Sequence, residues 1–446
     1  MDVYNLLRNK YDTFIYEGFN VQIKDDKMLI TYDFNIPDLT HFYPTLELKK
    51  FERNSFTDYL IFHIGLVELI SYWKCTCSKN VIIKAGYLNE EQINFFKKLY
   101  FYGLGELFYT NNIKVNYDDF MNISCVVDEN KITYPEFVGV GNLIPVGGGK
   151  DSNVTLEVLK SQRNINTPFI INPKEVNLDC TKIAGYNDDE IIVVRRSIDR
   201  KLIELNSQGF INGHTPFSAL VAFISFLSAF VYKKKYIVLS NESSANESNV
   251  EGTKINHQYS KTFEFENDFN NYTKKYFKID VKYFSLLRPL SEYQIALLFS
   301  NYKKYHQVFK SCNVGSKQKP WVWCCNCPKC LFVYIILSPF LYKDELVNIF
   351  NEDLFDKKEL LKTFIELTGY GDVKPFECVG TYDEVNYALI NVINKTENLP
   401  FLLKYYKDNF EMKNDSINFE KRWNNENNLD FEFVNLLKGE LDKYVK

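Results

Sequence analysis

Between about residue 140 and residue 240, short and fully apolar runs alternate with longer segments of mixed polarity. The short runs are Leu143–Val146, Phe169–Ile171, Ile191–Val194 and Tyr236–Leu239. Such runs, separated by helix-length segments, predict a parallel sheet that helices cover on both faces. A longer apolar run, Phe217 to Val231, is interrupted by serines and is too short to span a bilayer comfortably. We expect it to be a buried helix packed on that sheet.

The chain on either side of this region has a different pattern. Before it, strand-like and helical segments are mixed; after about residue 345 the sequence is polar with helical spacing. The expected N-terminal strands are Val21–Ile23, Met28–Tyr32, Val81–Ile83, Ile113–Val115 and Ile123–Val127, and the expected helices are Asp58–Trp73 and Glu90–Tyr100. The expected C-terminal helices are Asp344–Phe350, Lys357–Thr368 and Asp383–Ile393. We therefore predict an α/β chain in three parts: an N-terminal α+β region (1–138), a parallel-sheet domain (139–345) and a C-terminal helical module (346–446).

One histidine falls inside a predicted helix. Leu60, His63, Ile64 and Val67 recur at steps of three and four residues, which places them on one face of a helix. His63 is therefore predicted to be a core residue rather than a ligand.

Composition and charge exclude several classes of function. The 446 residues carry a formal net charge of −4, which gives no basic footprint for nucleic acid. The 37 Phe and 31 Tyr residues, with abundant Asn and Lys, are explained by coding bias in an AT-rich genome. The first ten residues lack the apolar core of a secretory signal. We expect a cytoplasmic protein without nucleic-acid or membrane partners; nothing in the sequence indicates its oligomeric state.

A glycine loop directly follows the first predicted parallel strand. Gly147, Gly148 and Gly149 precede Lys150, Asp151 and Ser152, and a helical pattern begins at Ser152. Three glycines let consecutive N–H groups approach an anion, and Asp151 or Ser152 could cap the helix behind them. The common P-loop is excluded, because it needs a glycine at position 144, where Ile stands, and Ser or Thr at position 151, where Asp stands. The segment is predicted to cradle phosphates; a ligand-free glycine turn is the alternative.

Polar segments follow two more of the predicted strands. Asn172 ends the second strand, and Ser240–Glu247, with Asn241 and Glu242, follows the fourth. In a parallel sheet, ligands bind beyond the carboxyl ends of the strands. We expect these segments to lie beside the glycine loop, although such a run can also be a solvated loop.

A second polar stretch is rich in cations and donors. It contains Lys254, Asn256, His257 and Lys261 and is a candidate cleft wall for an anionic substrate. His257 is a candidate acid/base group, or else an ordinary surface histidine. Arg288 is flanked by apolar residues and wants a carboxylate or phosphate partner, which a structural salt bridge would also supply.

Four of the ten cysteines have the spacing of a metal site. They are Cys312, Cys324, Cys327 and Cys330, with Cys325 as a spare thiol. Two consecutive C-x-x-C steps plus one more cysteine predict a structural Zn²⁺ with four sulfur ligands, and an iron–sulfur cluster is the main competitor. Cys378 lies outside this group, and such a residue is usually a small buried hydrophobe.

The motifs in this chain resemble those of a broad class of enzymes and, more specifically, those of one family. The glycine loop resembles the S-G-G-x-D-S loop of the PP-loop ATP pyrophosphatases, with Val146 in place of the serine and one residue more. In their order along the chain, a larger set of strings is similar to the MurL family of ATP-dependent UDP-N-acetylmuramoyl-L-alanyl-L-glutamate epimerases. These strings are 71–74, 145–152, 240–242, 244–247, 256–258, 287–290, 311–313, 323–330 and 375–381.

The resemblance implies a fold, a reaction and cofactors. The fold is a PP-loop (adenine nucleotide alpha hydrolase-like) parallel sheet with helices on both faces. The reaction inverts the terminal L-glutamate of a UDP-linked muramoyl dipeptide, with ATP and Mg²⁺ consumed and AMP and pyrophosphate released. ATP is expected on Gly147, Gly148, Gly149, Lys150, Asp151, Ser152, Asn172 and Asn241, and the substrate on Lys254, Asn256, Lys261 and Arg288.

The implied chemistry is physically consistent. A free carboxylate resists loss of the neighbouring α-proton, whereas its mixed anhydride with AMP has a carbonyl oxygen that accepts the developing charge, helped by Lys150, backbone N–H groups or Mg²⁺. We expect His257 to move the proton, with Cys378 and then Glu242 as the next candidates. The alternatives are a PP-loop ligase or amidase, an epimerase that activates a different carboxylate, and a non-catalytic zinc-stabilised nucleotide-binding scaffold.

Overall fold

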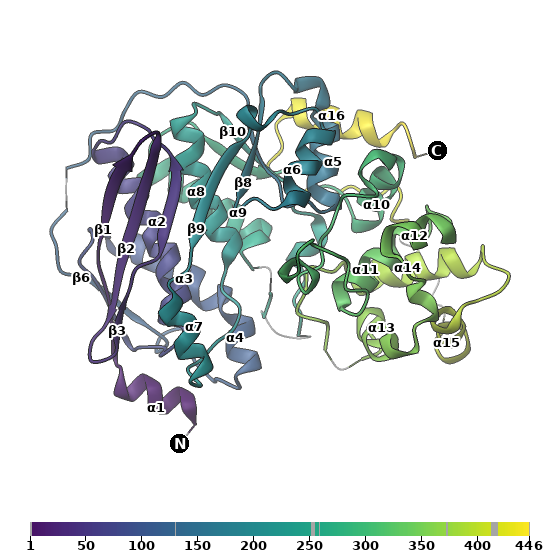
Figure 1. The fold of residues 1–446 in the computed structure, drawn as a ribbon, viewed down its shortest axis with the longest axis horizontal. Helices are drawn as coiled ribbons and strands as arrows, with labels where there is room; N and C mark the ends of the chain where they lie inside the picture. The colour runs from purple at the N-terminus through teal and green to yellow at the C-terminus, as the bar shows by residue number, and fades with distance from the viewer. Residues whose placement is uncertain are drawn as a thin grey trace.

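A single sheet runs through the larger part of the molecule (Figure 1). The structure is a computed structural model that describes residues 2–129, 131–250, 255–257, 259–371, 373–411 and 418–445. Within these residues the sheet has 11 strands in the order β11-β10-β7-β8-β9-β4-β2-β1-β5-β6, with β3 beside β2. The fold class is therefore α/β, as the apolar pattern predicts.

The parallel half of the sheet contains the four predicted strands and one more. Its strands are β7 (Asn142–Pro145), β8 (Asn166–Ile171), β9 (Ile192–Ser197), β10 (Tyr236–Leu239) and β11 (Lys282–Ser285). All neighbours in the order β11-β10-β7-β8-β9 are parallel. In chain order this is the 3-2-1-4-5 arrangement of doubly wound sheets, whose ligand site lies where the order reverses, between β7 and β10.

Antiparallel pairing joins the N-terminal strands to this half. The strands are β1 (Thr13–Lys24), β2 (Lys27–Ile36), β3 (Thr40–Phe42), β4 (Thr45–Lys49), β5 (Asn80–Ile83) and β6 (Asn122–Cys125). β4 pairs with β9, so the sheet continues across the predicted boundary at residue 138, and the three-part division stays a prediction. The strand predicted at Ile113–Val115 is wrong, because Ile113 instead closes a turn onto the carbonyl of Phe108 at the end of α4.

Helices cover both faces of the parallel strands. Leu143, Phe169 and Ile237 belong to one hydrophobic core, whereas their neighbours Ile144, Ile170 and Val238 belong to another. The helices before the cysteine group are α1 (Val3–Lys10), α2 (Ser55–Trp73), α3 (Glu90–Gly103), α4 (Gly105–Thr110), α5 (Lys150–Val158), α6 (Glu175–Ile183), α7 (Arg200–Ser207), α8 (Phe217–Val231), α9 (Phe263–Tyr276) and α10 (Glu292–Asn301).

The predicted buried helix is α8, which packs against α2. His63 of α2 is buried, with Nδ1 on the Tyr59 carbonyl and Nε2 2.8 Å from the Tyr272 hydroxyl. The core interpretation of this histidine is confirmed. No helix among the described residues is both long enough and apolar enough to cross a membrane.

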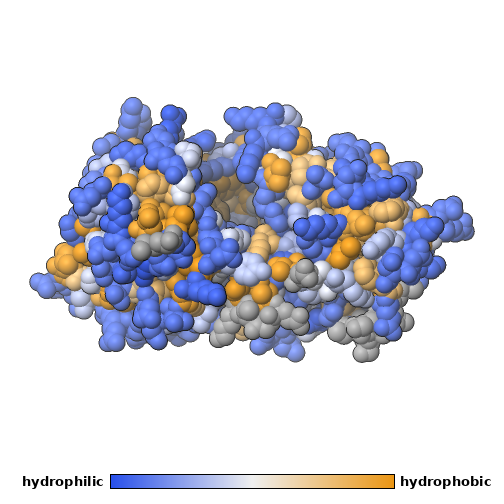
Figure 2. Space-filling model, turned by 90° about the horizontal axis from the view of Figure 1, so that it is seen from below, coloured by the Kyte–Doolittle hydropathy of each residue, from blue (hydrophilic) through white to orange (hydrophobic). Residues whose placement is uncertain are grey.

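The C-terminal part is helical, as its polar pattern predicts. Its helices are α11 (Pro328–Leu337), α12 (Lys343–Phe350), α13 (Leu361–Thr368), α14 (Tyr382–Ile393), α15 (Phe401–Asn409) and α16 (Phe431–Leu441). The last of them, α16, returns to the sheet and contacts α5 and α10. Seen from below, the surface has a recess between the part that holds the sheet and the helical part (Figure 2).

Candidate functional site

The glycine loop joins β7 to α5 with its backbone in an unusual conformation. Gly148 has φ +83°, and a Cβ there would lie 2.9 Å from the Val176 side chain. Helix α5 begins at Lys150, so the expected cap at Asp151 or Ser152 is wrong; Gly149 takes the cap position and no side chain caps the helix. The Ser152 hydroxyl instead binds inside the loop, accepting from the Gly148 N–H at 3.2 Å. The positive end of α5 is thereby left to face a ligand.

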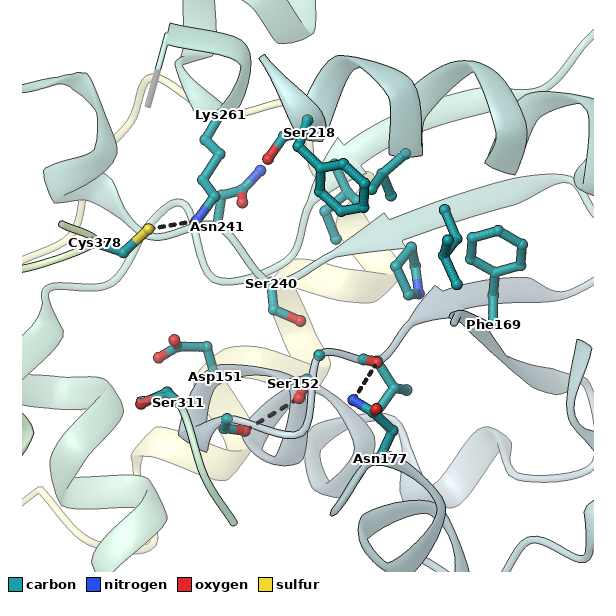
Figure 3. Close-up of a pocket in the computed structure, with 18 of the residues that line it drawn as sticks. Asp151, Ser152, Phe169, Asn177, Ser218, Ser240, Asn241, Lys261, Ser311 and Cys378 are labelled. Atoms are coloured by element: carbon teal, nitrogen blue, oxygen red, sulfur yellow. Dashed lines mark hydrogen bonds between the residues drawn. The ribbon is translucent and has the colours of Figure 1, made fainter. Parts of the chain in front are cut away.

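A cavity of about 550 Å³ opens in front of this loop (Figure 3). The carboxyl ends of β7, β8 and β10 all contribute to its wall. The residues predicted for the site that line it are Gly147, Gly149, Asp151, Ser152, Asn172, Asn241, Glu242, Lys261 and Cys378. Loops that are far apart in sequence therefore meet where the strand order reverses, as expected of a doubly wound sheet.

The cavity has an apolar end and a charged end. Phe169, Ile171, Val221 and Leu239 line the apolar end, and Phe169 lies away from Cys378 and Asp151 in Figure 3. The charged end contains Asp151, Ser311, Lys329, Lys261 and Cys378. The buried Ser311 hydroxyl has no protein partner among the described residues. An apolar slot beside a cluster of cations and N–H groups fits a molecule with one flat apolar end and one anionic end.

Lys150 does not reach this cavity. Its side chain is buried, and its ammonium is paired with the carboxylates of Asp151 and Glu292. Burial alone would lower the pKa of Lys150, but these two carboxylates raise it, so it stays charged. The backbone N–H of Glu292 in turn donates to Glu384 of α14 at 2.8 Å. Lys150 therefore connects the loop to the protein interior, and the cations at the cavity come from other elements.

Other predicted residues that the structure describes are held by hydrogen bonds within the protein, and of these only Asn172 and Asn241 line the cavity. Arg288 is buried and donates to the carbonyls of Glu242 and Lys261, with Glu266 as its salt-bridge partner, so the structural alternative describes it. Asn172 bonds the backbone of Arg196 through both its amide atoms. The remaining amides are held by one donated bond each: Asn241 donates to the Ser285 hydroxyl at 3.0 Å and Asn256 to the Ala245 carbonyl at 2.9 Å. Lys254 lies outside the described residues.

Cys378 stands among cations at the cavity wall. The Lys261 ammonium lies 3.0 Å from its sulfur, and the Lys329 ammonium contacts its backbone carbonyl. Burial by itself would raise the pKa of the thiol, but Lys261, the hydrogen bond with His257 and the charge of Lys329 lower the pKa of Cys378 to about 6. A thiol with this pKa is mostly thiolate at neutral pH, and a thiolate is the form in which cysteine is nucleophilic.

His257 lies behind Cys378 and does not line the cavity. Its Nδ1 contacts the carboxylate of Glu106, and its ring also hydrogen-bonds the Cys378 thiol. Burial opposes the charged form, but Cys378 and Glu106 outweigh it and raise the pKa of His257 to about 9. The pair is therefore an imidazolium beside a thiolate at neutral pH.

A second histidine adjoins this pair. The rings of His214 and His257 lie 4.2 Å apart, and His214 Nδ1 is 3.9 Å from Glu106. Burial and the nearby charges of His257, Lys261 and Lys74 lower the pKa of His214 to about 3. By distance alone Glu106, His214 and His257 could surround a metal ion, but the ammonium groups of Lys74 and Lys261 oppose a further cation there.

The four predicted cysteines form one compact group. Their sulfur atoms all lie within 4.8 Å of one another, with separations of 3.8 Å for Cys312–Cys327, 3.7 Å for Cys324–Cys330 and 3.5 Å for Cys327–Cys330. Sulfurs about 2.3 Å from one tetrahedral ion would lie about 3.8 Å apart. Cys325 is outside the group, since its thiol donates to the Phe350 carbonyl at 3.0 Å. The arrangement fits a single metal ion better than a polynuclear cluster, in which each thiolate binds its own iron.

Sequence reasoning missed several residues of this site. They are Glu106, His214, Glu292, Lys310, Ser311, Asn313 and Lys329. Lys329 could have been predicted, because it lies between two cysteines of the predicted metal site. Glu106 carries no local signal, since it lies in a short helix 151 residues before its partner His257.

Comparison with known proteins gives consistent matches. The model of the MurL N-terminal domain matches residues 6–286, and that of the MurL C-terminal domain matches residues 308–413. A UDP-N-acetyl-alpha-D-muramoyl-L-alanyl-L-glutamate epimerase of Xanthomonas oryzae pv. oryzae is 33% identical over 342 residues, which are 75% of this chain and 74% of that protein. Proteins of the same name from a Micromonospora strain and from Salinispora tropica are each 30% identical over 394 residues, which are 85% of this chain and 86% and 84% of theirs.

Proposed function

We propose, from the premise that this chain belongs to the MurL family, that it inverts the terminal L-glutamate of UDP-N-acetylmuramoyl-L-alanyl-L-glutamate at the expense of ATP. The chain is an enzyme of the isomerase kind, like the epimerases that it resembles. The observation that carries the proposal is one cavity lined by both the glycine loop and a reactive thiol. In this proposal the loop binds the nucleotide, and the thiol transfers the proton.

ATP would fit this cavity with its adenine at the apolar end and its phosphates at the glycine loop. The adenine would lie against Phe169 and Leu239, and the phosphates on Gly147, Gly149 and the N-terminus of α5. Asp151 is the carboxylate best placed to hold Mg²⁺, which would neutralise phosphate charge. This assignment treats the parallel half of the sheet as a PP-loop domain.

The first step would activate the substrate carboxylate. One carboxylate oxygen attacks the α-phosphorus of ATP, the bond to the β-phosphate oxygen breaks, and pyrophosphate leaves. The acyl-adenylate has no negative charge on its carboxyl group, so the neighbouring C–H is more acidic than in the free carboxylate. Lys261 and Lys329 are the cations at the charged end that could stabilise the enolate oxygen. After the α-proton is removed, the same group or an opposed acid would return a proton to the other face of the α-carbon, and water would finally release the D-glutamyl product and AMP.

The group that removes the proton is, in our proposal, Cys378 rather than His257. Cys378 lines the cavity and His257 stands behind it, so the thiolate is the group that reaches the substrate α-carbon. A thiolate whose pKa is about 6 is available as a base at neutral pH, and the proton it takes converts it to a thiol. Glu242 also lines the cavity, with its backbone carbonyl accepting from Arg288, and it is the next candidate.

The cysteine group is proposed to hold Zn²⁺ in a structural role. Four sulfur ligands would leave no open position for chemistry. The group nevertheless serves the site through its loops, because Lys329 contacts the Cys378 carbonyl and Asn313 donates to Glu377 at 2.6 Å. Binding of the metal would therefore fix the position of Cys378.

The test is solvent exchange in a Cys378 variant. Wild-type protein with ATP, Mg²⁺ and the L-glutamyl substrate in D₂O should release pyrophosphate and incorporate one deuterium at the α-position. Cys378→Ala should still release pyrophosphate but lose deuterium incorporation, because activation and proton transfer use different groups. Cys125→Ala is the control, since this half-buried thiol lies on β6 and does not line the cavity.

Three results would change the proposal. Undiminished deuterium uptake in Cys378→Ala would remove the thiol from the role of base. Pyrophosphate release that requires an added amine, without deuterium uptake, would favour a ligase or amidase. ATP binding without pyrophosphate release for every L-glutamyl compound would favour a nucleotide-binding scaffold.

A further inference from the structure

A carboxylate from the N-terminal part of the chain contacts the histidine that adjoins the candidate base. Glu106 belongs to the short helix α4, and its side chain is only 17% exposed. Its carboxylate contacts Nδ1 of His257, whose own side chain is 13% exposed. The backbone N–H of His257 is held separately, by the Asn249 side chain at 2.8 Å. With its backbone and Nδ1 both fixed, the His257 ring has one orientation toward Cys378.

The order of the three groups has a chemical meaning. A carboxylate, an imidazole and a thiol stand in series, with only the thiol at the cavity wall. In such a series the carboxylate orients the imidazole and stabilises its charged form, and the imidazolium stabilises the thiolate. Glu106 does not line the cavity, and its carboxylate contacts His257, so the route to the thiol runs through the histidine.

We propose that Glu106 is a positioning residue for Cys378, holding His257 as an imidazolium that keeps the thiol in its reactive, ionised form. The proposal rests on the proposed function for its role in epimerisation, but the ionisation of Cys378 can be tested without any substrate. It also makes the N-terminal part of the chain a contributor to the chemistry of a loop near residue 378.

Several other charged groups lie near this series and affect its ionisation. Lys261 and Lys329 stabilise the thiolate directly, and Glu377 of the same loop interacts with Lys329 and His257. The other groups nearby are His214, whose ring lies tilted against that of His257, and Lys74, whose charge acts on His214. Loss of the Glu106 charge would leave Lys261 in place, so we expect a partial rather than a complete loss of thiolate.

The sign of the effect follows from these neighbours. Without the carboxylate the pKa of His257 falls, so less imidazolium stands beside the sulfur at neutral pH. The pKa of Cys378 then rises. Were Glu106 to act on the thiolate directly by its negative charge, its removal would instead lower the pKa of Cys378, so the direction of the change separates the two cases.

The experiment measures the rate at which iodoacetamide alkylates Cys378 as a function of pH. Alkylation is followed on the peptide that contains Cys378, in metal-loaded protein without ATP or substrate. Glu106→Gln keeps the shape of the side chain and removes its charge. We expect the midpoint to move upward by about one pH unit, which is about a tenfold loss of thiolate below the midpoint. Glu106→Asp should recover part of this loss.

Two further variants keep the test independent of folding and of function. Glu91→Gln on α3 removes a carboxylate from an exposed salt bridge with Lys275 and should leave the midpoint unchanged. In a His257→Gln background, Glu106→Gln should cause no additional shift, because its effect passes through the imidazole. Melting curves of each variant establish that the protein is folded.

An unchanged or lowered midpoint in folded Glu106→Gln would overturn the proposal, as would a full further shift in the His257→Gln background. Neither outcome depends on epimerisation. If the midpoint moves as expected but no deuterium enters any L-glutamyl substrate, the proposed function fails and the role of Glu106 in ionising Cys378 stands.

Discussion

Replacing two adjacent glycines by alanine should separate folding from nucleotide binding. At Gly148 the backbone has φ +83° and a Cβ would lie 2.9 Å from Val176 and 3.1 Å from Asn177. At Gly147, by contrast, a Cβ would meet no heavy atom within 4 Å and would stand at the cavity wall. The two substitutions add the same methyl group to opposite environments.

The sizes of the effects follow from these contacts. For Gly148→Ala, the left-handed backbone costs about 1–2 kcal/mol and the overpacked methyl about 1–3 kcal/mol. A loss of about 2–5 kcal/mol is a large part of the stability of a typical domain, about 5–15 kcal/mol. Gly147→Ala should change the free energy of unfolding by less than about 0.5 kcal/mol. Its methyl group would instead occupy the space through which the backbone approaches phosphate, and should weaken ATP binding by about tenfold or more.

The assays are urea unfolding and calorimetric titration with ATP and Mg²⁺. Gly439→Ala on α16 is the control for ATP binding, because its Cβ also meets nothing within 4 Å and Gly439 does not line the cavity. Gly147→Ala that binds ATP normally would refute the loop as the phosphate site. Gly148→Ala that unfolds at the wild-type urea concentration would refute the steric argument.

Two further predictions concern the metal group and a buried histidine. Cys330→Ser should lose about one zinc per chain by elemental analysis together with soluble yield, because metal binding contributes folding free energy, whereas Cys325→Ser should keep the metal. The pKa of buried His63 is lowered from 6.5 to about 3 by burial, so only the unfolded state takes up a proton as the pH falls below 6.5. Stability is therefore lost on acidification, by about 1.4 kcal/mol at pH 5.5. In urea unfolding, His63→Gln should lose about 1.4 kcal/mol less than the wild type between pH 7.5 and 5.5. Equal losses in both proteins would contradict this prediction.

The parts of the fold that could be predicted are those with a signal along the chain. The strands β7, β8, β9 and β10 are continuous apolar runs, and the cysteine group has a fixed short spacing. β4 and β11 were missed because neither is a continuous apolar run, as β7 and β10 are at similar length: β4 alternates buried and half-buried positions, and β11 has a lysine at one end and a serine at the other. Their place in the sheet depends on pairing with distant strands.

The composition of the site was harder to predict than its location. The order of the strands brings the loops after β7 and β10 together, which sequence reasoning could anticipate from parallel topology. Which side chains face the cavity was not accessible in this way. Lys150 is as close to the glycines as Asp151 in sequence, yet it is buried against Glu292, a residue 142 positions away. His257 and Cys378 were expected as rivals for one role, whereas the structure places them in contact.

The position of Cys378 follows from supports that come from every part of the chain. The glycine loop is connected to the segment that carries Cys378. Lys150 pairs with Glu292, and the Glu292 N–H donates to Glu384. Glu384 also accepts from the Thr381 N–H at 2.7 Å. On the other side, Lys329 holds the Cys378 carbonyl. A shift of the loop on binding phosphate would change the Lys150–Glu292 pair and, through α10 and α14, the segment that carries the thiol. Because the buried charges in this connection are costly to leave unpaired, the two loops should move together or not at all. Activation of the carboxylate and removal of the proton would then occur in one fixed geometry.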